Sequence, residues 1–176
     1  GHLPSVQEDS TTASTISGDA TYHYSLGVLL RLEGKIEEAT DELKKAVAAD
    51  PGSPFLATEL ISLYSEQSDS SSAIALGEEM LAKNPDNIEL HLIMGGLYLS
   101  IHENKKAIAE HKRVIALDPK NLMAHLYLAI AYADEKRFDK SEETFKKMLK
   151  IDPENIMGIY YYGKVLLKMD RLQDAE

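Results

Sequence analysis

The stretch from Ile88 to Asn121 decides the fold: IELHLIMGGLYLSIHENKKAIAEHKRVIALDPKN. The same pattern recurs before and after this stretch at a constant spacing of 34 residues, without an insertion or deletion. Two of its positions illustrate the recurrence, with Ala39, Ala73, Ala107 and Ser141 at one and Pro51, Pro85, Pro119 and Pro153 at the other. A constant period of this length indicates an array of repeated structural units.

Each unit is predicted to form two helices. Apolar residues recur at helical spacing in the first half of the unit, from Leu90 to Tyr98, and in the second half, from Ala107 to Ile115. Gly95 stands where the second helix is expected to approach the first closely. Between units, a tetrapeptide such as Asp118-Pro119-Lys120-Asn121 ends one helix with proline and begins the next with an N-cap residue. The sequence therefore predicts an all-α fold.

These residues resemble the tetratricopeptide repeat (TPR) family, whose pattern has a small residue at position 8, Tyr at 11, Ala at 20 and Pro at 32 of each repeat. The resemblance covers residues 20–176, nearly the whole chain. It implies a right-handed α-solenoid of antiparallel helix pairs, with about four and a half repeats. The expected repeats are 20–53, 54–87, 88–121, 122–155 and the partial repeat 156–176.

Repeat 2 departs from the family pattern at two positions. It has bulky Ile61 at position 8, where a small residue is usual, and Gly77 at position 24, where a large residue is usual. Exchanges that conserve volume are tolerated in protein cores. We therefore expect Ile61 and Gly77 to compensate for each other across one helix pair.

The two ends of the chain differ from the repeats. Residues 1–19 are polar and have no period, which predicts a flexible leader that ends at Asp19, the expected cap of the first helix. Gly1-His2 is typical of the remnant of a cleaved tag. Repeat 5 is expected to supply a first helix from about Ile156 to Lys168 and the start of a second. The chain then stops at Glu176, so we expect a fragment with Leu166 partly uncovered.

Composition excludes several classes of function. The net charge of −10 argues against electrostatic binding of nucleic acid or of an anionic membrane surface. The absence of cysteine excludes disulfides, thiolate catalysis and cysteine metal sites. No apolar run approaches the roughly 18 residues of a membrane-spanning helix, so no membrane insertion is expected.

Catalytic, cofactor and metal sites are not expected, and the chain is predicted not to be an enzyme. His23, His91 and His125 share repeat position 4, which is a packing position, and neighbouring helices lie about 10 Å apart, too far to share one metal ion. Adjacent carboxylates such as Glu142 and Glu143 precede Lys146 and Lys147 by one helical turn. That arrangement indicates ion pairs on a solvated helix face.

The resemblance implies that the first helix of each repeat lines a concave groove. Mapping the ligand-contacting positions of the family onto this chain gives an apolar set, the predicted groove residues: Tyr24, Val28, Phe55, Leu92, Leu99, Met123, Leu126, Ile130, Met157 and Tyr160. The basic and amide residues with which TPR co-chaperones hold a C-terminal carboxylate are missing at the corresponding positions. We predict a protein–protein interaction scaffold that binds an apolar peptide or amphipathic helix.

The sequence is also compatible with other interpretations. Packing between neighbouring first helices would bury part of the predicted groove residues without any ligand. The chain would also suit a non-catalytic TPR segment of a larger enzyme or envelope assembly factor. A third reading is a self-association module, forming a homo-oligomer through the groove or through the uncapped C-terminal repeat. RNA reading by helical repeats is disfavoured by the strict period and the acidic charge.

Overall fold

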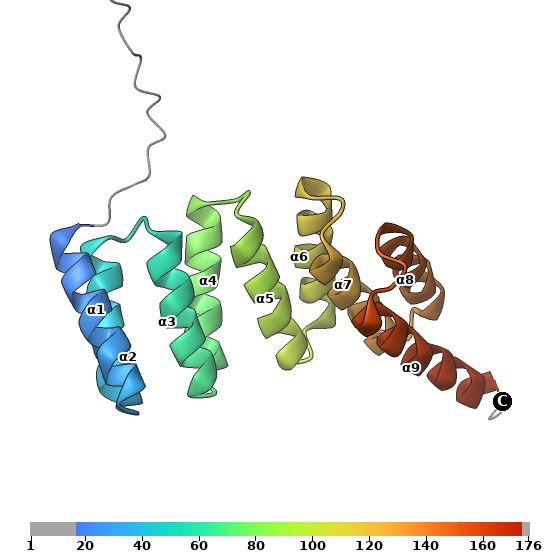
Figure 1. The fold of residues 1–176 in the computed structure, drawn as a ribbon, viewed down its shortest axis with the longest axis horizontal. Coiled ribbons are helices and arrows are strands. Elements are labelled where there is room, and N and C mark those ends of the chain that lie inside the picture. The colour runs from blue at the N-terminus through green and yellow to red at the C-terminus, as the bar shows by residue number, and fades with distance from the viewer. Residues whose placement is uncertain (1–16, 174–176) are drawn as a thin grey trace, which may run out of the picture. The chain divides into compact units, whose positions relative to one another are not determined.

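The computed structural model describes residues 17–173, with side chains as far as Asp170. Over this range the chain forms α-helices joined by short turns, which confirms the predicted all-α helical-repeat fold (Figure 1). The helices are α1 (Gly18–Leu32), α2 (Ile36–Ala49), α3 (Pro54–Glu66), α4 (Ser70–Lys83), α5 (Ile88–Ser100), α6 (Asn104–Leu117), α7 (Leu122–Asp134), α8 (Phe138–Ile151) and α9 (Ile156–Gln173). None of the described helices is long and apolar enough to span a bilayer.

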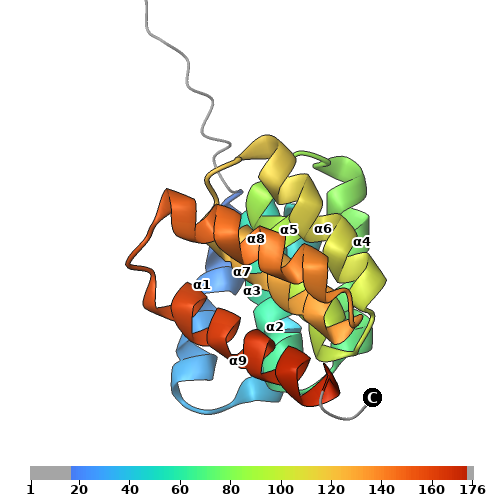
Figure 2. The same cartoon turned by 90° about the vertical axis from the view of Figure 1, so that its right-hand side faces the viewer.

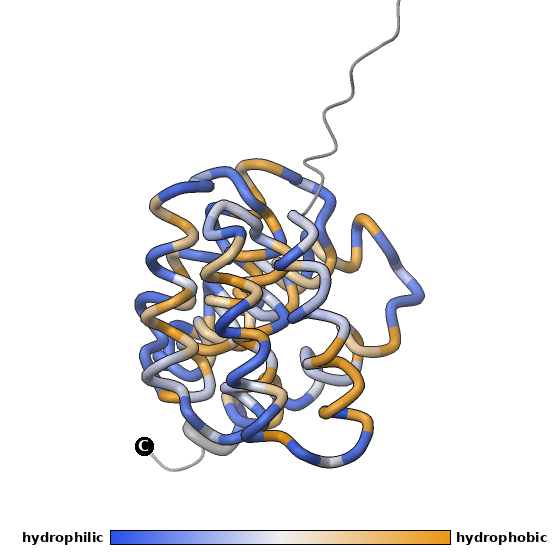
Figure 3. Tube along the Cα trace, turned by 90° about the vertical axis from the view of Figure 1, so that its left-hand side faces the viewer, coloured by the Kyte–Doolittle hydropathy of each residue, from blue (hydrophilic) through white to orange (hydrophobic). Residues whose placement is uncertain are grey.

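The chain divides into two compact units, Gly1–Leu56 and Ala57–Glu176, and the boundary falls within α3. In unit 1, α1 packs against α2 along its length. Gly27 permits the close approach, because a Cβ atom at this position would lie 3.2 Å from Leu43 Cγ and 3.3 Å from the Ala39 carbonyl oxygen. Hydrophilic and hydrophobic residues alternate along the helices, as the colours in Figure 3 show. In a helix such as α8, this alternation gives one apolar face for packing and one polar face.

In unit 2, helices that are consecutive in the chain pack against one another from α4 to α9. The first helices of repeats 3, 4 and 5 also touch directly, since α7 contacts both α5 and α9. Figure 2 shows α8 and α9 lying side by side. One core cluster surrounds Met94 and Tyr98, and a second surrounds Phe145 and Val165.

Helix starts follow the predicted cap residues. The side chains of Asn87 and Asn121 accept hydrogen bonds from the backbone N–H groups of Leu90, at 2.9 Å, and Ala124, at 3.0 Å. The first helix is an exception, because Ser17 caps it and Asp19 lies inside its first turn. The prediction that Asp19 is the cap was therefore wrong. The remainder of the predicted leader, residues 1–16, lies outside the described residues.

The turn inside each repeat places one residue in the left-handed region of backbone conformation. Gly34 has φ 78°, and the residues at the same position of the next three repeats, Ser68, His102 and Lys136, have φ 60°, 62° and 56°. Glycine adopts this conformation without steric cost, while other residues do so at a cost. Only the first repeat uses glycine at this position.

Two predictions about packing and helix limits need correction. The space beside Gly77 is filled by Met94 of the next repeat, because the three atoms nearest to a Cβ built at Gly77 all belong to Met94. The expected compensation between Gly77 and Ile61 is thus replaced by a contact with Met94. In repeat 5, α9 continues to Gln173, where a turn was expected after Lys168. The residues from Met169 to Gln173 include no glycine or proline that would end a helix.

Candidate functional site

The predicted groove residues of unit 1 lie at its first helix and at the start of α3. The rings of Tyr24 and Phe55 meet edge to face, with centroids 5.2 Å apart. Val28, one helical turn after Tyr24, is half-buried, and Phe55 is exposed. The structure therefore brings Tyr24 and Phe55 together as an aromatic pair.

The predicted groove residues of unit 2 lie on α5, α7 and α9, and α7 contacts both of the other helices. Three of these residues are large, apolar and exposed: Met123 and Met157 are each 51% exposed, and Tyr160 is 58% exposed. Leu92, Leu99 and Ile130 are half-buried. The packing alternative considered from the sequence accounts for these half-buried residues in part, since Leu99 packs against the core cluster around Met94.

Leu126 does not belong to an accessible surface. Its side chain is 7% exposed and packs in the core cluster that contains Phe145 and Val165. Replacing it with a charged residue would bury an unpaired charge, so Leu126 supports the fold and is removed from the set of contact candidates.

The histidines at repeat position 4 are held by protein groups. His23 Nδ1 lies 2.6 Å from Glu42 Oε2, and His91 Nδ1 lies 2.5 Å from Glu110 Oε2. His91 Nε2 also donates to the Pro85 carbonyl oxygen at 2.8 Å. These contacts tie the first helix to the second helix of the same repeat. They support the structural role that the sequence predicted for these side chains.

His111 is a different case, because its ring is fully buried and neither nitrogen has a hydrogen-bond partner. The ring stacks on Tyr127, with centroids 5.5 Å apart and an angle of 23° between the planes. Burial disfavours the charged form and lowers the pKa of His111 from 6.5 to about 4. His111 therefore behaves as a neutral aromatic packing residue at physiological pH.

The adjacent carboxylates form the surface ion pairs expected from the sequence. Glu142 pairs with Lys146, and Glu143 with Lys147, each at 2.7 Å. Hydrogen bonds from these lysines lower the pKa of both carboxyl groups. Between Ser17 and Asp170, no three His, Asp or Glu side chains are grouped so as to hold a metal ion.

The structure also contains a groove that the sequence analysis did not anticipate. Two adjoining pockets, of about 410 Å³ and about 740 Å³, share Ile115, His125 and Lys147. They lie on α7 between α6 and α8, and we call them together the lysine groove. Five lysines line it: Lys112, Lys120, Lys140, Lys147 and Lys150. The signal in the sequence was position 23 of the repeat, which is Glu42 in repeat 1 and Glu110 in repeat 3 but Thr144 in repeat 4.

Comparison with known families agrees with the repeat pattern. A family model described as tetratricopeptide repeat matches residues 102–156, and a second model with the same description matches residues 10–54. No curated protein matches the sequence.

Several solved structures share the fold. A MamA structure from Desulfovibrio magneticus RS-1 has a TM-score of 0.79 at 21% identity, covering 91% of this chain and 90% of that chain. Another MamA structure has a TM-score of 0.75 at 24% identity, covering 84% and 80%. YrrB, described as a TPR protein with an unusual peptide-binding site, has a TM-score of 0.69 at 19% identity, covering 86% and 78%. At these identities the likeness concerns the fold alone.

Proposed function

We propose that this chain, which belongs to the tetratricopeptide repeat family, binds an apolar peptide or amphipathic helix on the first helices of its repeats. The fold of this family serves as a protein–protein interaction scaffold. The observation that carries the proposal is the exposure of Met123, Met157 and Tyr160. Exposed apolar side chains that gather on adjoining elements are typical of interaction sites. All three residues come from α7 and α9, which pack against each other.

The chemistry of these side chains suits a peptide ligand. Methionine is unbranched and polarizable, so Met123 and Met157 can adapt to different apolar side chains. Tyr160 offers a large apolar ring with a polar hydroxyl group at its end. In unit 1, the pair formed by Tyr24 and Phe55, with Val28 beside it, offers a second aromatic contact of the same kind. The description of YrrB as a peptide-binding TPR protein supports peptide as the class of ligand.

The test is a selection of peptides displayed on phage against the wild-type protein and two variants. The double variant Met157→Glu/Tyr160→Glu places two carboxylates in the proposed contact surface. The control is Ile159→Glu, on the same helix and similarly exposed at 52%. Residues three apart share a helix face, while Ile159 lies between them in sequence and faces elsewhere. The variants should keep wild-type helicity, because every replaced side chain is about half exposed.

We expect the selected peptides to be apolar with helical spacing. They should lose at least tenfold in affinity for the double variant, about 1.4 kcal/mol, and keep wild-type affinity for Ile159→Glu. Equal binding to all three proteins would refute the proposal.

Self-association through the same surface is the second candidate, and it rests on the same exposed residues. Sedimentation equilibrium over a range of concentrations distinguishes it from binding of another protein. An oligomer that Met157→Glu/Tyr160→Glu abolishes and Ile159→Glu preserves would identify a second copy of the chain as the ligand.

A further inference from the structure

Repeats 1 and 3 each contain an internal contact between a histidine and a glutamate that repeat 4 lacks. In repeat 1, His23 Nδ1 meets Glu42 19 residues later, and in repeat 3, His91 Nδ1 meets Glu110 at the same separation. The residue 19 positions after His125 is Thr144. Its hydroxyl group donates to the Lys140 carbonyl oxygen at 2.7 Å and so satisfies itself within α8.

His125 is left with one nitrogen unpartnered. Its Nε2 donates to the Pro119 carbonyl oxygen at 2.9 Å, as the Nε2 of His91 does to Pro85. Its Nδ1 has no hydrogen-bond partner among the described residues, although the side chain is 95% buried. His125 and Thr144 line the same pocket, part of the lysine groove. The groove therefore includes the place that a glutamate occupies in repeats 1 and 3.

The rim of the groove is basic in a chain whose net charge is −10. Five lysines line it, and the only carboxylate among the lining residues is that of Glu143, which pairs with Lys147. The equivalent positions 34 residues earlier, in repeats 2 and 3, are Glu78, Asp86, Lys106, Arg113 and Ala116, which carry two acids and two bases. The groove thus differs from the equivalent positions 34 residues earlier both by the loss of the internal glutamate and by the gain of cations around its place.

We propose that the lysine groove is a second binding site, which takes an acidic peptide segment and places one of its carboxylates against His125 Nδ1. The internal pairs at His23 and His91 show the same contact made within the chain. Lys112, Lys140 and Lys150 are exposed around the groove and provide the complementary charge for neighbouring acidic residues.

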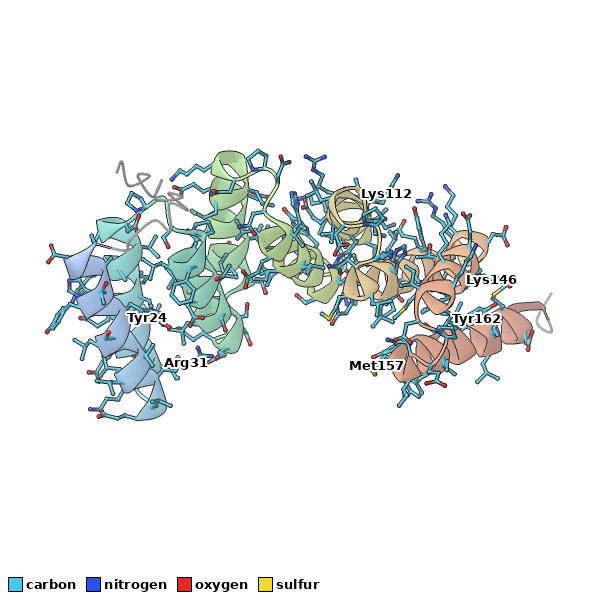
Figure 4. All side chains as sticks on the ribbon, turned by 45° about the horizontal axis from the view of Figure 1, so that its top comes forward. Tyr24, Arg31, Lys112, Lys146, Met157 and Tyr162 are labelled. Carbon is cyan, nitrogen blue, oxygen red and sulfur yellow. The ribbon has the colours of Figure 1, made fainter. Side chains whose placement is uncertain are left out.

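A peptide fits the groove better than a nucleic acid does. The floor includes apolar Ile115 and Leu128, on which apolar side chains of a peptide can pack between its acidic residues. The groove is also separate from the peptide surface proposed above, since Lys112 and Met157 lie at opposite edges of unit 2 in Figure 4. This second site therefore does not depend on the first.

Binding of a carboxylate at His125 requires a change in the protonation of its imidazole ring. With Nε2 donating to a carbonyl oxygen, Nδ1 of the neutral ring carries a lone pair. A carboxylate accepts hydrogen bonds only, so the ring must gain a proton at Nδ1 to donate to the ligand. The charged groups that line the two pockets with this ring are Lys112 on α6, Lys120 before α7, and Lys140, Glu143, Lys147 and Lys150 on α8.

The test uses fluorescent hexaglutamate as the probe and hexaglutamine as the uncharged control peptide of the same length. The decisive variant is Thr144→Glu, which supplies the carboxylate that repeats 1 and 3 already have. Because repeats 1 and 3 accommodate a glutamate at this position, repeat 4 should accommodate it as well. Thr144→Gln controls for size. Ala75→Glu, on the exposed face of α4, controls for the change in net charge. Circular dichroism establishes that all variants are folded.

We expect the wild-type protein to bind hexaglutamate and not hexaglutamine. Thr144→Glu should weaken binding about tenfold or more, equivalent to about 1.4 kcal/mol, while Thr144→Gln and Ala75→Glu stay near wild type. The ¹⁵N resonance of His125 Nδ1 should move from the lone-pair to the protonated range when the probe binds. A second variant, Lys112→Ala/Lys150→Ala, should also weaken binding and leaves the pocket floor intact.

Three outcomes would overturn the proposal. The first is no binding of hexaglutamate. The second is equal weakening by Thr144→Glu and Ala75→Glu, which would reveal attraction to the overall charge. The third is binding that leaves the His125 resonance unchanged, which would place the peptide elsewhere on the surface.

Discussion

The imidazole ring of His111 occupies the space directly beside Gly95. A Cβ atom built on Gly95 would lie 2.4 Å from His111 Cε1 and 2.5 Å from His111 Nε2. The sequence predicted that Gly95 permits a close approach between the two helices of repeat 3, and the structure confirms it, with an aromatic ring as the approaching group.

Replacing Gly95 with alanine should therefore destabilise the protein. A methyl group at this position must displace a fully buried ring, and overpacking of this kind costs about 1–3 kcal/mol. Gly96→Ala is the matched control, since a Cβ atom there has no neighbour within 4 Å. It should be neutral or stabilising by up to about 1 kcal/mol, because alanine favours the helix. Urea unfolding of both variants measures the difference, and equal stabilities would contradict this packing.

His111 should make the stability of the fold depend on pH. Its pKa is about 4 in the folded protein, below its ordinary value of 6.5. Between these values the unfolded chain binds a proton that the folded chain does not, so stability falls as pH falls from 6.5 toward 4. At 1.36 kcal/mol per pKa unit, the loss attributable to His111 reaches roughly 2–3 kcal/mol at pH 4.5.

The variant His111→Leu should remove this part of the pH dependence. The difference in unfolding free energy between pH 7 and pH 4.5 should shrink by roughly 2–3 kcal/mol relative to wild type. His102→Asn, in an exposed turn, serves as the control and should keep the wild-type difference. The same pH dependence in His111→Leu as in wild type would show that His111 titrates normally in the fold.

Gly77 and Met94 should be energetically coupled. A Cβ atom at Gly77 would lie 2.0 Å from Met94 Sδ, so Gly77→Ala is expected to cost about 1–3 kcal/mol. Met94→Ala leaves a cavity and should cost about 2–5 kcal/mol. In the double variant, the new methyl group occupies part of that cavity, so its cost should be smaller than the sum of the two. Thermal unfolding of the four proteins gives the coupling, and simple additivity would argue against the contact.

The left-handed turn residues offer a test in both directions. Ser68→Gly should raise stability by about 0.5–1 kcal/mol, because glycine relieves the left-handed conformation of this residue. Gly34→Ala should lower stability by about 1 kcal/mol for the converse reason. Melting temperatures of the two variants should shift in opposite directions. A shift in the same direction would show that the turns rearrange to accept either residue.

The elements of the fold could be predicted because their limits are local. Asn121, for example, caps α7 through its own side chain and needs no distant partner. Contacts between repeats were harder to predict from the sequence, because they depend on which side chain of a neighbouring repeat fills a given space. The residue that fills the space beside Gly77 proved to be Met94, from the next repeat, and no local pattern identifies that choice.

Exposure along the proposed peptide surface could not be predicted for the same reason. Leu92, Leu126 and Tyr160 share one repeat position, yet Leu126 is buried, Leu92 is half-buried and Tyr160 is exposed. The repeat pattern assigns all three to one face, while burial depends on the side chains of the neighbouring helices. The missing glutamate at Thr144, by contrast, was visible in the sequence once the repeats were aligned with one another.

The packing of unit 2 in chain order has a consequence for how fast it folds. From α4 to α9, each main contact joins helices that are consecutive or next but one. Forming such contacts closes only short segments of chain, so little loop entropy is lost before the contacts stabilise the structure. Chains with this low contact order typically fold in microseconds to milliseconds. A repeat leaving the ribosome can accordingly pack on the one before it while later repeats are still being synthesised.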